Sequence, residues 1–254
     1  MRRQAKSRIA FGVAGVLLAL LLAFFGAMLY FHDQAAEMSP APDAPQAEPD
    51  SDGFPVVDWA YWHSINPDVI GWITIPGTVI NYPIVQAQES DPDYYLKHDV
   101  HRNYNVYGCP YLDAGCREGG LFGSLNAVTF GHHMNDGSMF AAVADYSDKS
   151  FSASHSRILV QTPEEKRVYE VQAAEIIPGW KAAKRVEFKD TADFLAYYSE
   201  RFDGCKMKLV QNCQSVEQTG HVLTLCTCSY NYWSQNERTL VYGASVKSLP
   251  GNGS

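Results

Sequence analysis

The sequence predicts a mainly β protein: a closed β-barrel of about seven to eight strands with a few peripheral helices, preceded by one N-terminal transmembrane helix. Two observations carry this prediction. Short runs rich in β-branched and aromatic residues recur through roughly the last 200 residues, as in β-barrels. The N-terminal end instead holds one long apolar run without a charge.

The apolar run covers residues 9–31, which are 23 consecutive uncharged residues. As a helix it would reach about 34 Å, enough to cross a hydrocarbon core of about 30 Å. A cleaved signal peptide has a shorter apolar core, so we interpret the run as an uncleaved signal anchor, although the small residues in 23–27 leave cleavage open. The basic flank at residues 1–8 then predicts a cytoplasmic N-terminus and an extracellular chain from His32 onward.

Residues 32–54 are predicted to form a disordered tether. This segment contains four prolines and six acidic residues but no Lys or Arg. Such a composition cannot bury a core, and its like charges repel one another. Residues 55–254 remain, a normal length for one domain. The formal charge of the whole chain, −8, argues against a nucleic-acid-binding protein.

The strands of the domain follow one another at short intervals. The first two lie within residues 69–86 and are separated by a turn at Pro76-Gly77. Further strands are predicted at 126–131, 157–161, 167–177, 221–229 and 239–246.

Helices are fewer, and only three segments favour them. Residues 191–202 have the clearest boundaries, with Asp190 or Thr191 as the N-cap and Gly204 as the stop signal. The other two helices are predicted at 57–65 and 138–145.

Six cysteines stand in the part of the chain predicted to be extracellular, where disulfides are permitted. Cys226 and Cys228 are two apart in an apolar strand, so their side chains share one face and a disulfide between them would be strained. Two thiols at the end of a strand indicate a reactive site. The other four form two local pairs that either close small disulfide loops or remain buried thiols: Cys109 with Cys116, and Cys205 with Cys213.

A nucleophilic cysteine needs a base or a cation beside it and a donor for the oxyanion. His132 and His133 directly follow the strand at 126–131, a common position for functional residues. Arg238 begins the strand after the cysteines and lies opposite Cys228 if these two strands form a hairpin. No Cys or His spacing matches a zinc-site pattern, so we expect no metal.

This order of His, Cys and Arg, behind a signal anchor, resembles the class B sortases, a family of cysteine transpeptidases. The resemblance implies that His132 rather than His133 is the catalytic histidine, that Cys228 rather than Cys226 is the nucleophile, and that Arg238 is the catalytic arginine. The resemblance is carried by NPDVIGWITIPGTVINYPIVQ (66–86), YYLKHD (94–99), FGHHMNDGSMF (130–140) and TLCTCSYNYWSQNERTLVYG (224–243).

The resemblance also implies an activity and its partners. Sortases cleave a C-terminal sorting motif after Thr, commonly of NPxTN or related type in class B, and form a thioester. They then transfer the protein to an amine of the peptidoglycan precursor or, in pilin-polymerising members, to a pilin lysine. The implied location is the membrane of a Gram-positive-type envelope, with a single pass through the bilayer at residues 9–31 and an extracellular catalytic domain. No metal or organic cofactor is implied.

The chain departs from the family in two places. The family usually has Ser where this chain has Cys226, and commonly has Asn where this chain has Pro92, four residues before Leu96. The expected substrate-groove residues are therefore Leu96, Cys226 and Thr227.

Two rival readings stay open. A surface cysteine peptidase of another fold is one, although papain-like enzymes place Cys before His, whereas here His132 comes 96 residues before Cys228. L,D-transpeptidases place an Arg two residues after the Cys, which does not match Arg238 either. The non-enzymatic alternative is an anchored adhesin with an unreactive Cys228.

Overall fold

The computed structural model divides the chain into two compact units, Met1–Glu37 and Met38–Ser254. In the first unit, residues 15–30 form a helix. No described helix combines the length and the apolar character that crossing a membrane requires. The predicted basic flank, residues 9–14 and 31 of the predicted span, and residues 32–48 of the predicted tether lie outside the described residues. The structure describes residues 15–30, 49–179, 184–229 and 236–252.

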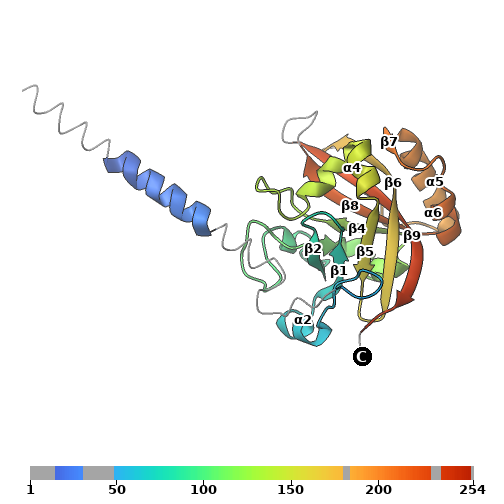
Figure 1. Ribbon diagram of the computed structural model, residues 1–254, viewed down its shortest axis with the longest axis horizontal. Coiled ribbons are helices and arrows are strands. Elements are labelled where there is room, and N and C mark those ends of the chain that lie inside the picture. Colours follow the sequence, from blue (N-terminus) through green and yellow to red (C-terminus); the bar gives the residue numbers. More distant parts are fainter. Residues whose placement is uncertain (1–14, 31–48, 180–183, 230–235, 253–254) are drawn as a thin grey trace, which may run out of the picture. The chain divides into compact units, whose positions relative to one another are not determined.

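The second unit contains a closed barrel of eight strands (Figure 1). The strands run in the order β5-β1-β2-β3-β4-β8-β9-β6, and β6 pairs back onto β5 to close the sheet, while the short β7 adds to β6. The predicted closed barrel is confirmed. Its strands are β1 (Val69–Thr74), β2 (Asn81–Gln86), β3 (Tyr111–Leu112), β4 (Asn126–Phe130), β5 (Arg157–Gln161), β6 (Glu165–Pro178), β7 (Met207–Lys208), β8 (Val222–Ser229) and β9 (Glu237–Pro250).

All seven strands expected from the sequence are present, counting two within residues 69–86. The turn between β1 and β2 uses Gly77 at φ +83°, which glycine adopts without steric cost. β3 and β7 were not predicted because each has two residues, too few to show a repeating pattern. β8 lies between β4, which is distant in the sequence and runs parallel to it, and β9, which follows it in the chain and runs antiparallel.

Two of the three predicted helices are confirmed. The carboxylate of Asp58 accepts a hydrogen bond from Tyr61 N at the start of α2, and Asp190 accepts one from Asp193 N at the start of α5. The helices are α2 (Trp59–Ile65), α3 (Gly120–Gly123), α4 (Lys149–Ser154), α5 (Thr191–Gly204) and α6 (Gln214–Thr219), with 3-10 turns η1 (Tyr94–Leu96), η2 (Ala114–Cys116) and η3 (Ala141–Ser147).

The helix predicted at 138–145 is wrong in type and position, because the structure has the 3-10 turn η3 there instead. The preceding residues explain the difference. Asp136 accepts hydrogen bonds from the backbone N–H and the hydroxyl of Ser138 and so stabilises a tight turn. Gly137 and Met139 both have positive φ, which a right-handed helix cannot contain.

Helix α5 covers the outer face of the barrel beside α6, near β7 and β9 (Figure 1). Phe194, Tyr198 and Phe202, four residues apart along one face of α5, are fully buried against residues of β6, β8 and β9. Burying such a side chain contributes about 2–3 kcal/mol. The strand that carries Cys226 is therefore held under this helix.

All six cysteines lie in the described part of the chain, and all six are free thiols. Cys109 and Cys116, considered from their spacing as a disulfide, donate to different carbonyls, those of Pro83 and Asn126. The other considered pair, Cys205 and Cys213, is also unbonded, and both thiols pack in the cluster under α5.

The folded domain begins before Phe54, so the predicted tether is too long at its C-terminal end. Phe54 is fully buried beside Val168 and Leu159. The Asp50 carboxylate accepts a hydrogen bond from Lys166 Nζ at 2.7 Å, and Asp52 pairs with Lys247 at 2.6 Å. From composition alone these acids were predicted to repel one another in the tether. The sequence does not show that Lys166 of β6 and Lys247 of β9 lie opposite them.

We expect Asp50→Asn to destabilise the domain by about 2 kcal/mol or more, because Lys166 is only 4% exposed and loses its charge partner. Burial raises the pKa of Asp50, but hydrogen bonds from Lys166, Phe54 and Asp52 outweigh it, so the pKa lies below its ordinary value. The pair therefore stabilises the protein near neutral pH, and this contribution is lost as the pH falls below about 4.

Urea unfolding monitored by tryptophan fluorescence measures this effect. Asp52→Asn is the matched control, because the Asp52–Lys247 pair is exposed and should contribute less than about 1 kcal/mol. Equal losses in the two variants would contradict the proposed difference.

Candidate active site

The register of three neighbouring strands brings the predicted catalytic residues to one end of the barrel. Cys228 on β8 pairs with Arg238 on β9, as the hairpin prediction required. Directly paired residues project to the same face of a sheet. On the other side, Phe130 of β4 pairs in parallel with Cys226, which brings His132, two residues further on, level with Cys228.

The segment after β4 is tied to β8 by three hydrogen bonds. Gly131 N donates to Cys226 O at 3.2 Å, and the hydroxyl of Thr227 donates to Gly131 O at 2.9 Å. His133 Nδ1 donates to Cys228 O at 3.0 Å. Thr227, expected from the sequence to line the substrate groove, is only 2% exposed and ties β8 to the segment after β4.

Close packing explains why the residue before the two histidines, Gly131, is a glycine. A Cβ atom at this position would lie 2.4 Å from the ring of Phe140, a residue that is itself fully buried. Phe140 N in turn donates to His132 O at 2.8 Å. The aromatic ring therefore packs directly against the backbone that carries His132.

His132 is half-buried, and its ring nitrogen Nε2 lies 2.7 Å from Leu96 O. A carbonyl oxygen only accepts hydrogen bonds, so we assign the proton to Nε2. Nδ1 is then the nitrogen left to exchange a proton with reacting groups. Leu96, expected in the substrate groove, is half-buried at the end of η1.

The two neighbouring thiols differ sharply in environment. Cys226 is 7% exposed and packs in the cluster under α5. Burial raises the pKa of the Cys226 thiol to about 12, so it remains neutral at physiological pH. Cys226 was expected from the sequence to line the substrate groove, and in the structure its side chain is covered. Cys228 is only half-buried and is the one cysteine of the six that is not in the core.

Arg238 is half-buried and donates through one guanidinium nitrogen to Glu237 O at 2.9 Å. This contact fixes the side chain near the strand end and leaves further N–H groups of the fork for an anionic oxygen. The guanidinium also lies close enough to Cys226 to oppose, in part, the rise of its thiol pKa.

Sequence reasoning missed several residues of the site. A Cβ atom at Gly179 would lie 2.2 Å from Asn236 Oδ1 and 3.3 Å from Arg238 Nη1, so only glycine lets the end of β6 approach β9 here. Lys184 pairs with Asp113 and lies 5.0 Å from the ring of Phe130. No sequence pattern marks these positions, since their importance comes from contacts across the fold.

A closed barrel that presents a half-buried thiol level with a histidine and opposite an arginine has the parts of an enzyme for thiol-dependent acyl transfer. The comparison with known proteins agrees. The sortase domain family matches residues 73–246.

Two curated relatives are similar along most of their length. The chain is 30% identical to sortase B of Listeria monocytogenes, covering 72% of this chain and 71% of that protein. It is 29% identical to sortase B of Staphylococcus aureus, covering 72% of each. A solved Staphylococcus aureus sortase B–substrate complex is 26% identical, covers 74% of this chain and 84% of its own, and has a TM-score of 0.63. The chain belongs to the sortase family and is a class B sortase, a cysteine transpeptidase that anchors proteins to the cell wall.

We expect a thiol reagent to distinguish Cys228 from the other five cysteines. Under native conditions iodoacetamide should alkylate Cys228 and leave the five buried thiols unmodified, Cys226 among them because burial keeps it protonated. Peptide mapping by mass spectrometry measures the sites. Labelling in urea, where all six should react, is the control, and native labelling of Cys226 as fast as Cys228 would contradict the assignment.

Proposed function

We propose that this chain is a membrane-anchored class B sortase that cleaves a C-terminal sorting motif of NPxTN or related type after Thr and passes the protein to a cell-wall amine. The observation that carries the proposal is the alignment of His132, Cys228 and Arg238 at the ends of β4, β8 and β9. The likeness to a sortase B solved with a substrate supports it.

The first step forms a thioester. Cys228 Sγ attacks the carbonyl carbon of the motif Thr, and the C–N bond of the following peptide breaks. His132 Nδ1 has received the proton of the Cys228 thiol and passes it to the leaving amine, while Nε2 keeps its own proton on Leu96 O. Arg238, opposite Cys228, and backbone N–H groups stabilise the oxyanion.

The second step reverses the proton movements. An amine of the acceptor attacks the thioester carbonyl while His132 takes its proton, and the C–S bond breaks to restore the Cys228 thiolate. The neutral, buried Cys226 takes no part, because its thiol is covered and its pKa is raised.

The membrane part of the proposal is supported by the sequence. Residues 9–31 are uncharged and follow four positive charges, the pattern of a signal anchor with a cytoplasmic N-terminus. The acidic, proline-rich residues that follow from His32 then space the catalytic domain from the bilayer.

Three variants test the chemistry on fluorogenic peptides that carry candidate sorting motifs. Cys228→Ala should lower turnover more than about 10³-fold and leave no thioester detectable by mass spectrometry. His132→Ala should lower it about 10²- to 10⁴-fold. Arg238→Lys should lower it about 10²-fold, because an ammonium cannot reproduce the fork of donors.

His101→Ala and Arg157→Lys are the matched controls, since both residues are exposed and lie outside the site. A fully active Cys228→Ala would overturn the assignment. Adding wall-peptide amines or a pilin-type lysine peptide as acceptors shows which amine resolves the thioester.

A further inference from the structure

The carbonyl that binds His132 does not belong to the barrel. Leu96 ends η1, a single 3-10 turn, and its own N–H donates to Asp93 O within the same short segment. Strand pairing therefore does not set the position of the Leu96 carbonyl. Some other contact must hold this turn if the ring of His132 is to keep a fixed orientation.

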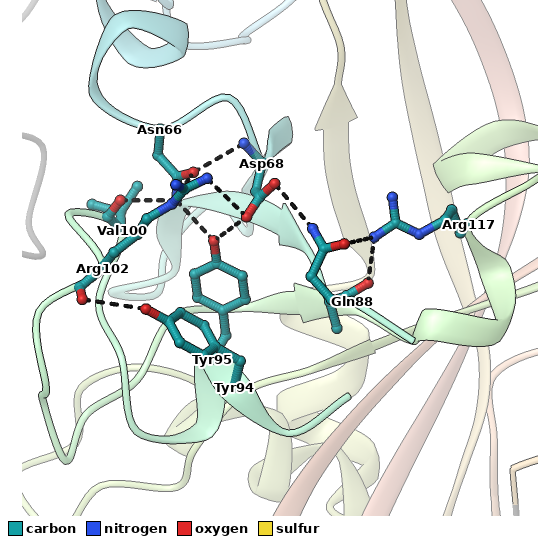
Figure 2. A network of polar contacts seen from close by, with 9 residues as sticks. Asn66, Asp68, Gln88, Tyr94, Tyr95, Val100, Arg102 and Arg117 are labelled. Atoms are coloured by element: carbon teal, nitrogen blue, oxygen red, sulfur yellow. Dashed lines mark hydrogen bonds and ion pairs between the residues drawn. The ribbon is translucent and has the colours of Figure 1, made fainter. Parts of the chain in front are cut away.

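Tyr95, in the middle of the turn, provides that contact. Its side chain is fully buried, and its hydroxyl donates to Asp68 Oδ2 at 2.7 Å and accepts from Asn66 Nδ2 at 3.0 Å (Figure 2). Burial raises the pKa of Tyr95 well above its ordinary value, so the hydroxyl remains a donor throughout the physiological range.

Asp68 joins this hydroxyl to the rest of the fold. Arg102 Nη2 donates to Asp68 Oδ2 at 3.1 Å, and Gln88 Nε2 donates to Asp68 Oδ1 at 3.2 Å. Arg117 Nη2 donates to Gln88 Oε1 at 2.8 Å. Figure 2 shows Arg102, Gln88 and Tyr95 reaching Asp68 from separate segments, with Arg117 behind Gln88. Asp68 immediately precedes β1, so the network ties the turn to the start of the barrel.

A second element packs on the same turn. Cys109 N donates to Tyr95 O at 2.9 Å. A Cβ atom at Gly108 would lie 2.4 Å from Tyr95 O, 3.1 Å from Leu96 O and 3.2 Å from His132 Cδ2. The turn, its carbonyl and the histidine ring are therefore in direct contact, and movement of one displaces the others.

We propose that Asp68 and Tyr95 are positioning residues of the active site, which hold the Tyr94–Leu96 turn so that Leu96 O keeps the proton of His132 on Nε2. This inference rests on the proposed role of His132. Its consequence is that Nδ1 alone exchanges protons in both steps of the reaction. Without the anchored carbonyl, the ring rotates and populates both neutral tautomers, and part of the enzyme presents the wrong nitrogen.

The test uses the full chain in detergent micelles, with ¹⁵N-histidine labelling and a sorting-motif peptide as substrate. His132→Ala identifies the His132 ring signals. In the wild type these should show protonation at Nε2, and in Tyr95→Phe they should shift toward a mixture of tautomers. In the same variant kcat should fall about tenfold, the effect of one lost hydrogen bond, while KM changes less than about twofold.

Tyr146→Phe is the matched control. Tyr146 is also fully buried, and its hydroxyl donates to His155 O at 2.6 Å, so its loss costs stability without touching the turn. It should leave the His132 signals and kcat unchanged. Asp68→Asn, which keeps an acceptor oxygen for Tyr95, should have a smaller effect than Asp68→Ala, and these two variants decide the matter if Tyr95→Phe fails to fold.

Wild-type His132 signals and kcat in Tyr95→Phe and Asp68→Ala would overturn the inference, as would an equal change in Tyr146→Phe. Failure of the proposed function is distinguishable, because it would show as a wild-type protein that cleaves no sorting peptide. The ring signals report on Tyr95 and Asp68 whether or not the protein cleaves the peptide.

Discussion

The pairing of β8 with β4 on one side and β9 on the other is the constraint on which the active site depends. Side chains alternate along a strand, so a slip of one residue would turn Cys228 to the opposite face. The slip is prevented because Cys226 and its partner Leu240 are buried under the aromatic face of α5. Packing of the core thus fixes the register, and the register places Cys228 opposite Arg238.

The same strand shows how a protein separates an inert thiol from an available one. Cys226 and Cys228 share one face of β8, but only Cys226 packs in the buried cluster under α5. Under the helix a thiolate would lose its solvation, which raises the pKa of Cys226 to about 12. Cys228, two residues further on, is half-buried and pairs with Arg238 on β9. The active site therefore begins where the buried core ends, between Cys226 and Cys228.

The sequence was sufficient for the parts of the molecule that repeat a pattern. The long strands, the α5 cap at Asp190 and the partnership of Cys228 with Arg238 were predicted because alternation, capping and hairpin geometry are local. The sequence did not reveal Gly108 or Gly179, whose role comes from atoms that approach them across the fold. For the same reason the acids at the end of the predicted tether were misassigned, and the thiol pairs remained undecided. Proximity in sequence does not tell which carbonyl or lysine a side chain meets.

The site therefore has two halves with different physical origins. The sulfur and the guanidinium are placed by a hydrogen-bonded ladder, which is rigid because every residue of it is paired. The backbone beside His132 is also tied to β8, but its ring is oriented by a carbonyl on a short turn, and such a turn has few backbone bonds of its own. Burying the hydroxyl of Tyr95 is unfavourable unless it makes hydrogen bonds. Asp68 and Asn66, which lie outside the turn, provide them. A polar network near the end of the barrel, which would be costly as mere packing, is explained when it orients the one catalytic ring that strand pairing does not orient.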